Sequence, residues 1–498
     1  MLFNSFEFLL GFLPAMLLAY AVVRRLGVGR WSLAALLVGS LVFYGESEWS
    51  FLLLLLGSIV ANWLLGAWLL REARSARRSL VLALGVSLNL AVLFGFKYAY
   101  FTSTVLSAAT GFTLLSAPVV LPIGISFYTF QQIAYLVDIA RGETAERDPL
   151  RYALFVSFFP QLIAGPIVHH KELSGQFTGL RERPFASDLA VGVTIFTIGL
   201  AKKVLLADTF ALVASPVFDG AAAGNAPGTL AAWAAVSAYA LQIYFDFSAY
   251  SDMAIGLGRM FGIVLPFNFA SPYKATSIIE FWRRWHITLS RFLRDYLYIP
   301  LGGNRRGPLR QRLNLFLTML LGGIWHGAGW TFVLWGALHG LMLVSAHLWR
   351  RHLGRHRLPA LPAQALTLLA VVLAWVPFRA ADLPTTWRVY AGLAGLGPDT
   401  AALPVPSLLP TLAAGALPAL LVLLLGWGIA LLAPNTQTLL RGFAPGLASP
   451  GYATGIEGPA RGGHAWRPSP AQAMALGALL AVSILSLGRA SEFIYFQF

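Results

Sequence analysis

Cysteine and charge are both scarce in this sequence. None of the 498 residues is a cysteine, which excludes disulfide bonds, cysteine-ligated zinc and an acyl thioester carried on the chain itself. Charged residues make up 11% of the chain and hydrophobic residues 57%, whereas a soluble globular protein has about 25% charged residues. This composition excludes a disordered chain and a single soluble domain. It predicts an all-α protein that crosses a membrane several times.

The charges that are present are unequal in sign, with 36 basic and 21 acidic side chains and a net charge of +15. In a soluble protein this excess would suggest nucleic-acid binding. In a membrane protein, basic residues gather in cytoplasmic loops, which is the simpler explanation. We therefore expect a lipid bilayer around the chain and no nucleic-acid partner.

Apolar segments of roughly the length of a membrane helix alternate with charged loops in the first hundred residues. The segments are 6–23, 31–44, 51–70 and 80–96. Arginine-rich loops follow the first and third segments, and an acidic loop follows the second, so the N-terminus is expected outside the cytoplasm. The first segment has no small-residue cleavage site before Arg24, so we expect a retained helix rather than a signal peptide.

Further apolar stretches fill most of the remaining chain. They lie at about 119–140, 152–168, 188–213, 229–262, 313–348, 361–378, 407–433 and 471–488. Those at 229–262 and 313–348 are too long for one crossing, so each is expected to be a helix pair or a helix with a re-entrant turn. The sequence thus predicts one domain, 1–498, with 11 to 13 membrane-embedded helices and a polar loop at 434–470 before the last helix. No internal repeat is evident, which disfavours an inverted-repeat transporter.

The segment 274–312 concentrates basic charge, with nine basic and two acidic residues. Apolar side chains recur at helical spacing from Trp282 to Tyr296, and arginines occupy the other face. We expect a basic amphipathic helix on the cytoplasmic surface. It could anchor the chain to the membrane surface, or it could attract an anionic ligand such as a phosphate-bearing cofactor. The glycine-rich basic loop 301–307 does not have the spacing of a P-loop.

One of the nine histidines lies where charge is costly. His326 sits in an uncharged run, 14 residues after Arg312, which is about 21 Å along a helix at 1.5 Å per residue. Arginines flank both ends of the run, so His326 is expected near the tip of a hairpin or re-entrant turn, deep in the bilayer. A buried neutral imidazole there suits general-base catalysis. The alternative is a packing histidine bonded to a backbone carbonyl, and His339 is expected to have such a packing role.

Carboxylates within the apolar stretches are few. Asp246 and Asp252 are two of them, in a run that also holds Tyr244 and Ser248. They could form hydrogen bonds between helices or line a substrate channel. No spacing typical of a zinc protease, a serine hydrolase or a P-loop is present, so we predict no metal site.

Several motifs in combination resemble the membrane-bound O-acyltransferase (MBOAT) family, most closely its alginate O-acetyltransferase branch. The blocks that carry the resemblance are Phe281–Ser290, Tyr298–Asn304, Gly323–Trp330, Tyr244–Asp252, Pro122–Phe127, Phe159–Pro166 and Phe493–Phe498. They span most of the chain, although 390–470 matches less. The resemblance implies a ring of helices around a thin central region with a catalytic tunnel. It also implies that His326 is the catalytic histidine and that His286 occupies the second motif position.

The resemblance further implies acetyl transfer from a cytoplasmic donor, expected to be acetyl-CoA, towards an extracytoplasmic polysaccharide, expected to be alginate. No permanently bound cofactor is expected. Donor contacts are expected from Trp282, Arg283, Arg284, Trp285, Arg291, Asn304, Arg305 and Arg306. Channel-lining residues are expected to be Tyr244, Asp246, Ser248, Asp252, Asn314, Trp325 and Trp330. The expected location is a bacterial inner membrane, with extracytoplasmic partner proteins that complete the transfer.

In the mechanism that follows, His326 removes a proton from the acceptor hydroxyl, and the alkoxide attacks the thioester carbonyl. Backbone N–H groups at 327–329 or the side chain of Asn314 are candidate donors to the resulting oxyanion. A covalent acetyl-histidine is an alternative. Other acceptors are cellulose, peptidoglycan and teichoic acid, the last receiving D-alanine. A polymer transporter that changes no bond is the competing class of function.

Overall fold

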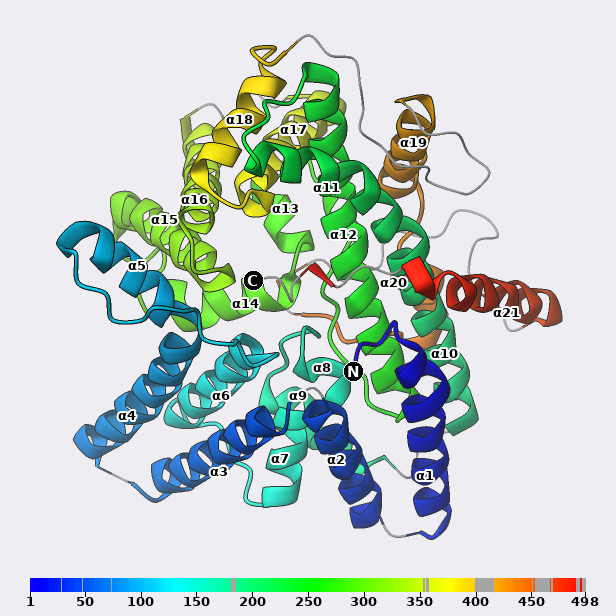
Figure 1. The fold of residues 1–498 in the computed structure, drawn as a ribbon. Helices are drawn as coiled ribbons and strands as arrows, with labels where there is room; N and C mark the ends of the chain where they lie inside the picture. The colour runs from blue at the N-terminus through cyan, green and yellow to red at the C-terminus, as the bar shows by residue number, and fades with distance from the viewer. Residues whose placement is uncertain are drawn as a thin grey trace. The chain divides into compact units, whose positions relative to one another are not determined.

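The structure is a computed structural model. It describes all residues except 28, 47, 73, 181–184, 353, 355–357, 399–415, 450, 453–465, 467–468, 490–492 and 495–498. Throughout the described residues the regular elements are helices (Figure 1), and a single isolated bridge joins Pro266 to Leu447. The prediction of an all-α chain is confirmed. Part of the predicted polar loop 434–470 and most of the Phe493–Phe498 motif lie outside the described residues.

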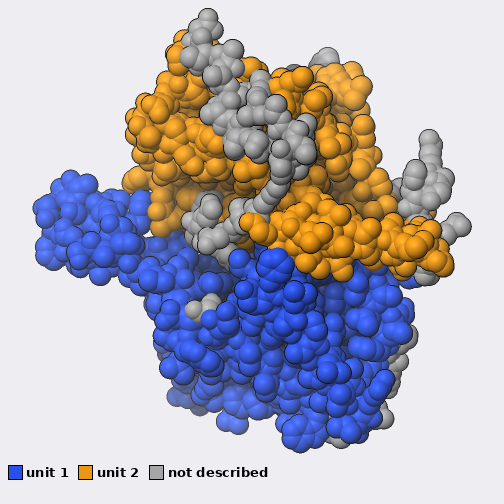
Figure 2. Space-filling view, turned by 45° about the vertical axis from the view of Figure 1, so that its right-hand side comes forward, with its two compact units in different colours: residues 1–197, 250–267, 443–447 blue, residues 198–249, 268–442, 448–498 orange. Residues whose placement is uncertain are grey.

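The chain divides into two compact units, coloured separately in Figure 2. The first comprises 1–197, 250–267 and 443–447, and the second 198–249, 268–442 and 448–498. Helices of the first unit are η1 (Glu7–Phe12), α1 (Leu13–Arg25), α2 (Gly29–Gly45), α3 (Trp49–Arg71), α4 (Ser75–Leu93), η2 (Phe94–Tyr98), α5 (Ala99–Thr110), α6 (Ile125–Ala140), α7 (Pro149–Ser157), α8 (Phe159–Leu162) and α9 (His170–Thr178). The helices α10 (Phe185–Ala201) and α12 (Thr229–Met260) contribute residues to both units.

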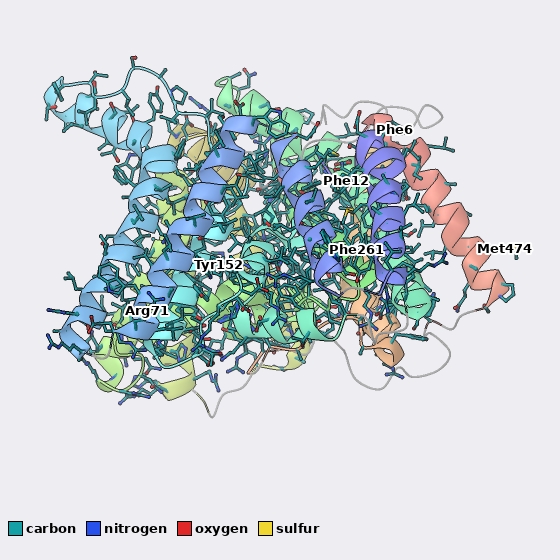
Figure 3. All side chains as sticks on the ribbon, turned by 90° about the horizontal axis from the view of Figure 1, so that it is seen from below. Phe6, Phe12, Arg71, Tyr152, Phe261 and Met474 are labelled. Atoms are coloured by element: carbon teal, nitrogen blue, oxygen red, sulfur yellow. The ribbon has the colours of Figure 1, made fainter. Side chains whose placement is uncertain are left out.

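Helices of the second unit include the hairpin that carries the predicted catalytic histidine. They are η3 (Lys202–Ala207), α11 (Asp208–Ala222), η4 (Pro272–Lys274), α13 (Ile278–Arg284), α14 (Ile287–Leu293), η5 (Arg294–Tyr298), α15 (Gly307–His326), α16 (Trp330–His352), α17 (Ala360–Arg379), α18 (Leu383–Leu393), α19 (Ala416–Leu432), α20 (Thr436–Leu439), α21 (Pro470–Leu485) and η7 (Leu487–Arg489). On α21, Met474 is exposed (Figure 3).

Six continuous helical runs among the described residues are long and apolar enough to cross a membrane. They are Glu7–Arg25, Trp49–Arg71, Ser75–Thr110, Phe185–Ala222, Trp330–His352 and Ala360–Arg379, and shorter apolar helices lie at Gly29–Gly45, Leu417–Leu432 and Pro470–Leu485. The chain is therefore a multi-span membrane protein. The stretch 313–348 forms a helix pair as predicted, whereas 229–262 is largely one unbroken helix, α12, so the prediction of a break there was wrong.

The first unit places its two arginine-rich loops at one end. Arg30 pairs with Asp148 at 3.5 Å, and Arg78 donates to the carbonyl of Ile139 at 2.6 Å, so both loops meet the connection between α6 and α7. Figure 3 shows Arg71 at this end of α3. The N-terminal ammonium group pairs instead with Glu46, between α2 and α3. This arrangement agrees with the alternation of basic and acidic loops in the sequence.

The segment 274–312 is not one amphipathic helix. It breaks at His286, whose backbone is left-handed at φ 42° and ψ 55°, and the halves form α13 and α14. Trp282, Trp285 and Phe292 are at least 90% buried, so these aromatic rings pack inside the second unit rather than against a membrane surface. The prediction of one helix failed because helical periodicity shows only which side chains are apolar. A single left-handed residue between them redirects the backbone and ends the helix.

Candidate functional site

A close-packed helix pair, α15 and α16, holds His326 at its turn. A methyl group added at Gly323 would lie 2.5 Å from the carbonyl oxygen of Phe332, and one at Gly336 would lie 2.7 Å from that of Met319. Only glycine permits this approach at both positions. The chain then leaves α15 through Gly327 in an extended conformation. His326 is therefore the last residue of a helix that packs closely against its partner.

Aromatic rings surround His326, which is 5% exposed. Its ring centroid lies 4.9 Å from that of Trp325, 5.0 Å from Trp335 and 5.3 Å from Phe378. Trp335 comes from α16 and Phe378 from α17, so three helices build this enclosure. Such surroundings hold an imidazole in one orientation and exclude bulk water, which general-base catalysis needs.

The second predicted histidine, His286, has different surroundings. It is fully buried, its Nδ1 lies 3.0 Å from Oδ1 of Asn268, and its ring lies edge-on to Phe247 at 4.7 Å. Burial lowers the pKa of His286 to about 3, so the ring is neutral at physiological pH. Its left-handed backbone and its bond to Asn268 tie α14 to the preceding loop. Its chemical role remains a prediction.

A third histidine joins the enclosure through tryptophan rings. Nε1 of Trp282 donates to Nδ1 of His339 at 3.3 Å. The His339 ring lies 4.7 Å from Trp335, which in turn contacts His326. The sequence suggested hydrogen bonding within the helix packing for His339, and the bond from Trp282 agrees. The sequence did not indicate that the His339 ring is linked to His326 through the ring of Trp335.

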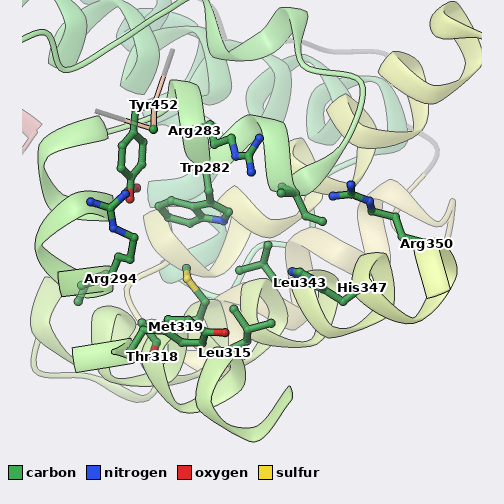
Figure 4. A pocket seen from close by; sticks show the side chains of 15 residues that line it. Trp282, Arg283, Arg294, Leu315, Thr318, Met319, Leu343, His347, Arg350 and Tyr452 are labelled. Atoms are coloured by element: carbon green, nitrogen blue, oxygen red, sulfur yellow. The ribbon is translucent and has the colours of Figure 1, made fainter. Parts of the chain in front are cut away.

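A cavity of about 320 Å³ opens beside this cluster in the second unit, with Trp282 in its wall (Figure 4). Its apolar side is formed by Trp282, Leu293, Leu315, Met319 and Leu343, and its cationic groups are Arg283, Arg294 and Arg350, with His347 beside them. An apolar floor with a rim of guanidinium groups suits a ligand that carries both a hydrocarbon portion and phosphates.

The cavity and His326 share one face of α15. Thr318 and Met319 line the cavity, and Gly322 and His326 follow at the spacing of successive helical turns. Met319 is seven residues before His326, which is about 10 Å along the helix. A methyl group added at Gly322 would lie 3.2 Å from the side chain of Leu293. Leu293, which also lines the cavity, therefore packs closely against this face of α15.

Two of the eight predicted donor contacts, Trp282 and Arg283, line this cavity. Arg284 pairs with Glu280 at 2.8 Å, and buried Arg291 donates to Ser449 at 3.3 Å. Trp285 is buried, with its ring 4.9 Å from that of Trp375. The remaining three, Asn304, Arg305 and Arg306, are exposed in the loop before α15.

Other cavity residues were missed by the sequence reasoning. Arg350 and His347 lie at the far end of α16, and only the fold of the hairpin brings them beside Arg283. Arg294 lies over the ring of Tyr452 at 5.0 Å, and burial raises the pKa of Tyr452 to about 12. The charge density of 274–312 was a usable signal for Arg294, but no local signal pointed to Tyr452.

The predicted channel-lining residues have varied surroundings. Asp246 pairs with Lys203 at 2.8 Å and accepts the backbone N–H of Ile494 at 2.9 Å. Tyr244 packs among aromatic rings, and Ser248 and Asp252 are buried. Nδ2 of Asn314 donates to the carbonyl of Gly303 at 3.0 Å. Trp325 contacts His326, whereas Trp330 is 55% exposed at the start of α16.

Comparison with known proteins gives a consistent result. Residues 140–376 match the model of the membrane-bound O-acyltransferase family. A "peptidoglycan O-acetyltransferase" of Helicobacter pylori is 42% identical over 426 residues, covering 80% of each chain. A "probable alginate O-acetylase" of Pseudomonas aeruginosa is 43% identical over 409 residues, covering 80% of this chain and 75% of the relative. A "teichoic acid D-alanyltransferase" of Streptococcus thermophilus is 27% identical over 238 residues, covering 46% and 57%.

Proposed function

Since the chain belongs to the membrane-bound O-acyltransferase family, we propose that this acyltransferase takes an acetyl group from cytoplasmic acetyl-CoA and passes it to an extracytoplasmic polysaccharide, with alginate as the acceptor. The membrane is a bacterial inner membrane with the N-terminus outside the cytoplasm. Because the family consists of acyltransferases, a polymer transporter that changes no bond is set aside.

The observation that supports the donor is the cavity lined by Trp282, two ring contacts away from His326. Acetyl-CoA carries several negative charges on its phosphates and an apolar arm that ends in the thioester. Arg283 and Arg350 supply positive charge at the cavity, whereas the charge of Arg294 is paired with Asp295 at 2.6 Å. Guanidinium groups bind phosphate oxygens in pairs. The apolar face of α15 leads from there towards His326. The thioester would thus approach the histidine while the phosphates stay at the cationic rim.

In the proposed reaction, His326 accepts the proton of the attacking hydroxyl group, and the hydroxyl oxygen bonds to the acetyl carbonyl carbon. The carbonyl oxygen takes up the displaced electron pair. When the tetrahedral intermediate collapses, the carbon–sulfur bond breaks and the proton on His326 passes to the departing sulfur. The products are the acetyl ester and free CoA, and His326 is neutral again.

The acceptor side rests on the relatives. The acetyl-transferring relatives match over 80% of this chain, whereas the D-alanyl-transferring relative matches over 46%, which favours acetyl as the transferred group. The immediate hydroxyl group belongs either to the polymer or to an extracytoplasmic partner protein that completes the transfer. Alginate and peptidoglycan fragments should therefore be offered side by side.

The test uses the full chain in lipid nanodiscs with acetyl-CoA labelled in the acetyl group. Release of CoA can be followed with a thiol reagent, since the protein contains no cysteine. His326→Ala should reduce transfer by at least about 100-fold, the lower range for loss of a general base. His352→Ala removes an exposed histidine from the end of α16 and should leave the rate unchanged.

Full transfer by His326→Ala would overturn the assignment of the base. Absence of any CoA release by the wild-type protein, with either polymer and with membranes that supply partner proteins, would overturn the donor. Acetylation of peptidoglycan fragments but not of alginate would overturn the acceptor and leave the donor and the base in place.

A further inference from the structure

Two side chains on α16 in the cluster around His326 each bury one ring nitrogen without a hydrogen-bond partner that the structure describes. Trp335 is 1% exposed and His339 is fully buried. They are one helical turn apart, and their ring centroids are 4.7 Å apart. Among the described residues, neither the indole Nε1 of Trp335 nor Nε2 of His339 has a hydrogen-bond partner. A buried donor left unpaired costs about 1–3 kcal/mol, so two adjacent ones require an explanation.

The tautomer of His339 follows from its other nitrogen. Nδ1 accepts the indole N–H of Trp282, and an atom that accepts a hydrogen bond carries no proton in the neutral ring. The proton therefore lies on Nε2, which makes Nε2 a donor. An indole nitrogen can only donate. Both unpartnered groups are thus donors, and both call for an acceptor atom that the described part of the chain does not supply.

The position of the two donors relates them to both parts of the site. The Trp335 ring lies 5.0 Å from His326 and 5.9 Å from Trp282. His326 is the proposed base, and Trp282 lines the cavity proposed for the donor. The Trp335 ring therefore connects the cavity wall to His326, and the carbonyl oxygen of a thioester bound between them would be an acceptor within reach of it.

We infer that the indole N–H of Trp335 and the Nε2–H of His339 form the oxyanion hole of this enzyme. They hold the acetyl carbonyl oxygen in the ground state and donate more strongly as that oxygen gains negative charge. Both groups keep their protons, since only the hydrogen bonds strengthen. This inference rests on the proposed function.

Two other candidate donors are already engaged. The Asn314 amide donates to Gly303, and the N–H of Gly329 donates to the carbonyl of Gly327 at 3.1 Å. The indole nitrogen of Trp375 is also buried without a hydrogen-bond partner in the described ranges, and its ring packs against Trp335 at 5.9 Å and His339 at 6.1 Å. Trp335 combines burial, an unpartnered N–H group and a ring contact with His326, and His339 lies against it one helical turn along α16.

The first experiment removes a single N–H group at constant ring shape. Benzothienylalanine, in which sulfur replaces the indole N–H, is introduced at position 335 of the full chain in nanodiscs, next to Trp335→Phe. With acetyl-CoA and alginate oligosaccharide, we expect kcat to fall about 100-fold to 1000-fold, the range for loss of one oxyanion donor, while KM for acetyl-CoA changes less than threefold. Trp375→Phe is the packing control and should lose less than tenfold in kcat.

The second readout is the infrared stretch of the bound acetyl carbonyl, marked with ¹³C. In the His326→Ala variant, which prevents turnover but retains Trp335 and His339, the band should lie at lower wavenumber than in free acetyl-CoA, because hydrogen bonds weaken the double bond. Adding the sulfur analogue at 335, or His339→Phe, should shift it back towards the free position. His339→Gln retains a side-chain N–H and should shift it less.

An unchanged kcat for the sulfur analogue would refute the oxyanion hole. So would a carbonyl band that stays at the same wavenumber with the sulfur analogue at 335 and with His339→Phe. A loss for Trp375→Phe as large as for Trp335→Phe would refute it in favour of packing alone. A wild-type protein that releases no CoA would refute the proposed function instead, which keeps the two failures separate.

Discussion

The contact between α15 and α16 offers a perturbation whose size can be worked out from the structure. In Gly336→Ala, the new methyl group would lie 2.7 Å from the carbonyl oxygen of Met319 and 3.0 Å from Cα of Leu320. Ordinary contact begins at 3.4 Å, so α16 must retreat from this oxygen by the difference of 0.7 Å. Both obstacles are backbone atoms, so no side-chain rotation can relieve the clash.

The retreat acts on catalysis more than on stability. Overpacking costs about 1–3 kcal/mol, and alanine recovers up to about 1 kcal/mol over glycine in a helix, so the net loss of stability is about 0–2 kcal/mol. Trp335, the preceding residue, would move with the backbone away from His326. A displacement of about 1 Å at a reaction centre can cost about 100-fold in rate. We therefore expect a rate reduced about 10-fold to 100-fold in a protein that still folds.

The assay is acetyl transfer from acetyl-CoA in nanodiscs, paired with thermal unfolding of the same preparation. Gly477→Ala on α21 is the matched control, since its added methyl group meets no atom within 4 Å and should leave the rate unchanged. If Gly336→Ala transferred acetyl at the wild-type rate, the close approach of α15 and α16 would not be what positions the site, and this prediction would be refuted.

Two further predictions concern the membrane and the buried charges. Ser50, in the first turn of α3, and Ser75, at the start of α4, lie near opposite ends of α3 in a chain without cysteine. In Ser50→Cys a membrane-impermeant maleimide should label intact cells, and in Ser75→Cys it should label only after permeabilisation. The reverse pattern would show the opposite topology. Lys203→Met leaves two buried carboxylates without their cation. We expect it to lower the free energy of unfolding by about 3–5 kcal/mol, measured by thermal unfolding, and the second substitution Asp246→Asn should restore part of this loss. An unchanged unfolding temperature for Lys203→Met would contradict the importance of these ion pairs.

Composition and periodicity identified the membrane helices because the requirement is local. A helix in lipid must satisfy its backbone internally and present apolar side chains over its whole length, and each condition can be read from about 20 consecutive residues. The hairpin α15–α16 was predictable for this reason, with arginines at both ends and glycines at its turn. The unbroken α12 was not, because length alone does not say whether a long apolar run bends.

Some features of the candidate site could also be predicted from the sequence, whereas others could not. The sequence by itself singled out His326, because a histidine in an uncharged apolar run is costly wherever it lies, and it marked 274–312 by its arginines. Only the tertiary structure decided that this segment breaks at His286, that Arg350 and Tyr452 join Arg283 around one cavity, and that Trp335 lies against both His326 and His339. These contacts join residues that are far apart in the chain, so they depend on how helices pack rather than on what any one segment contains.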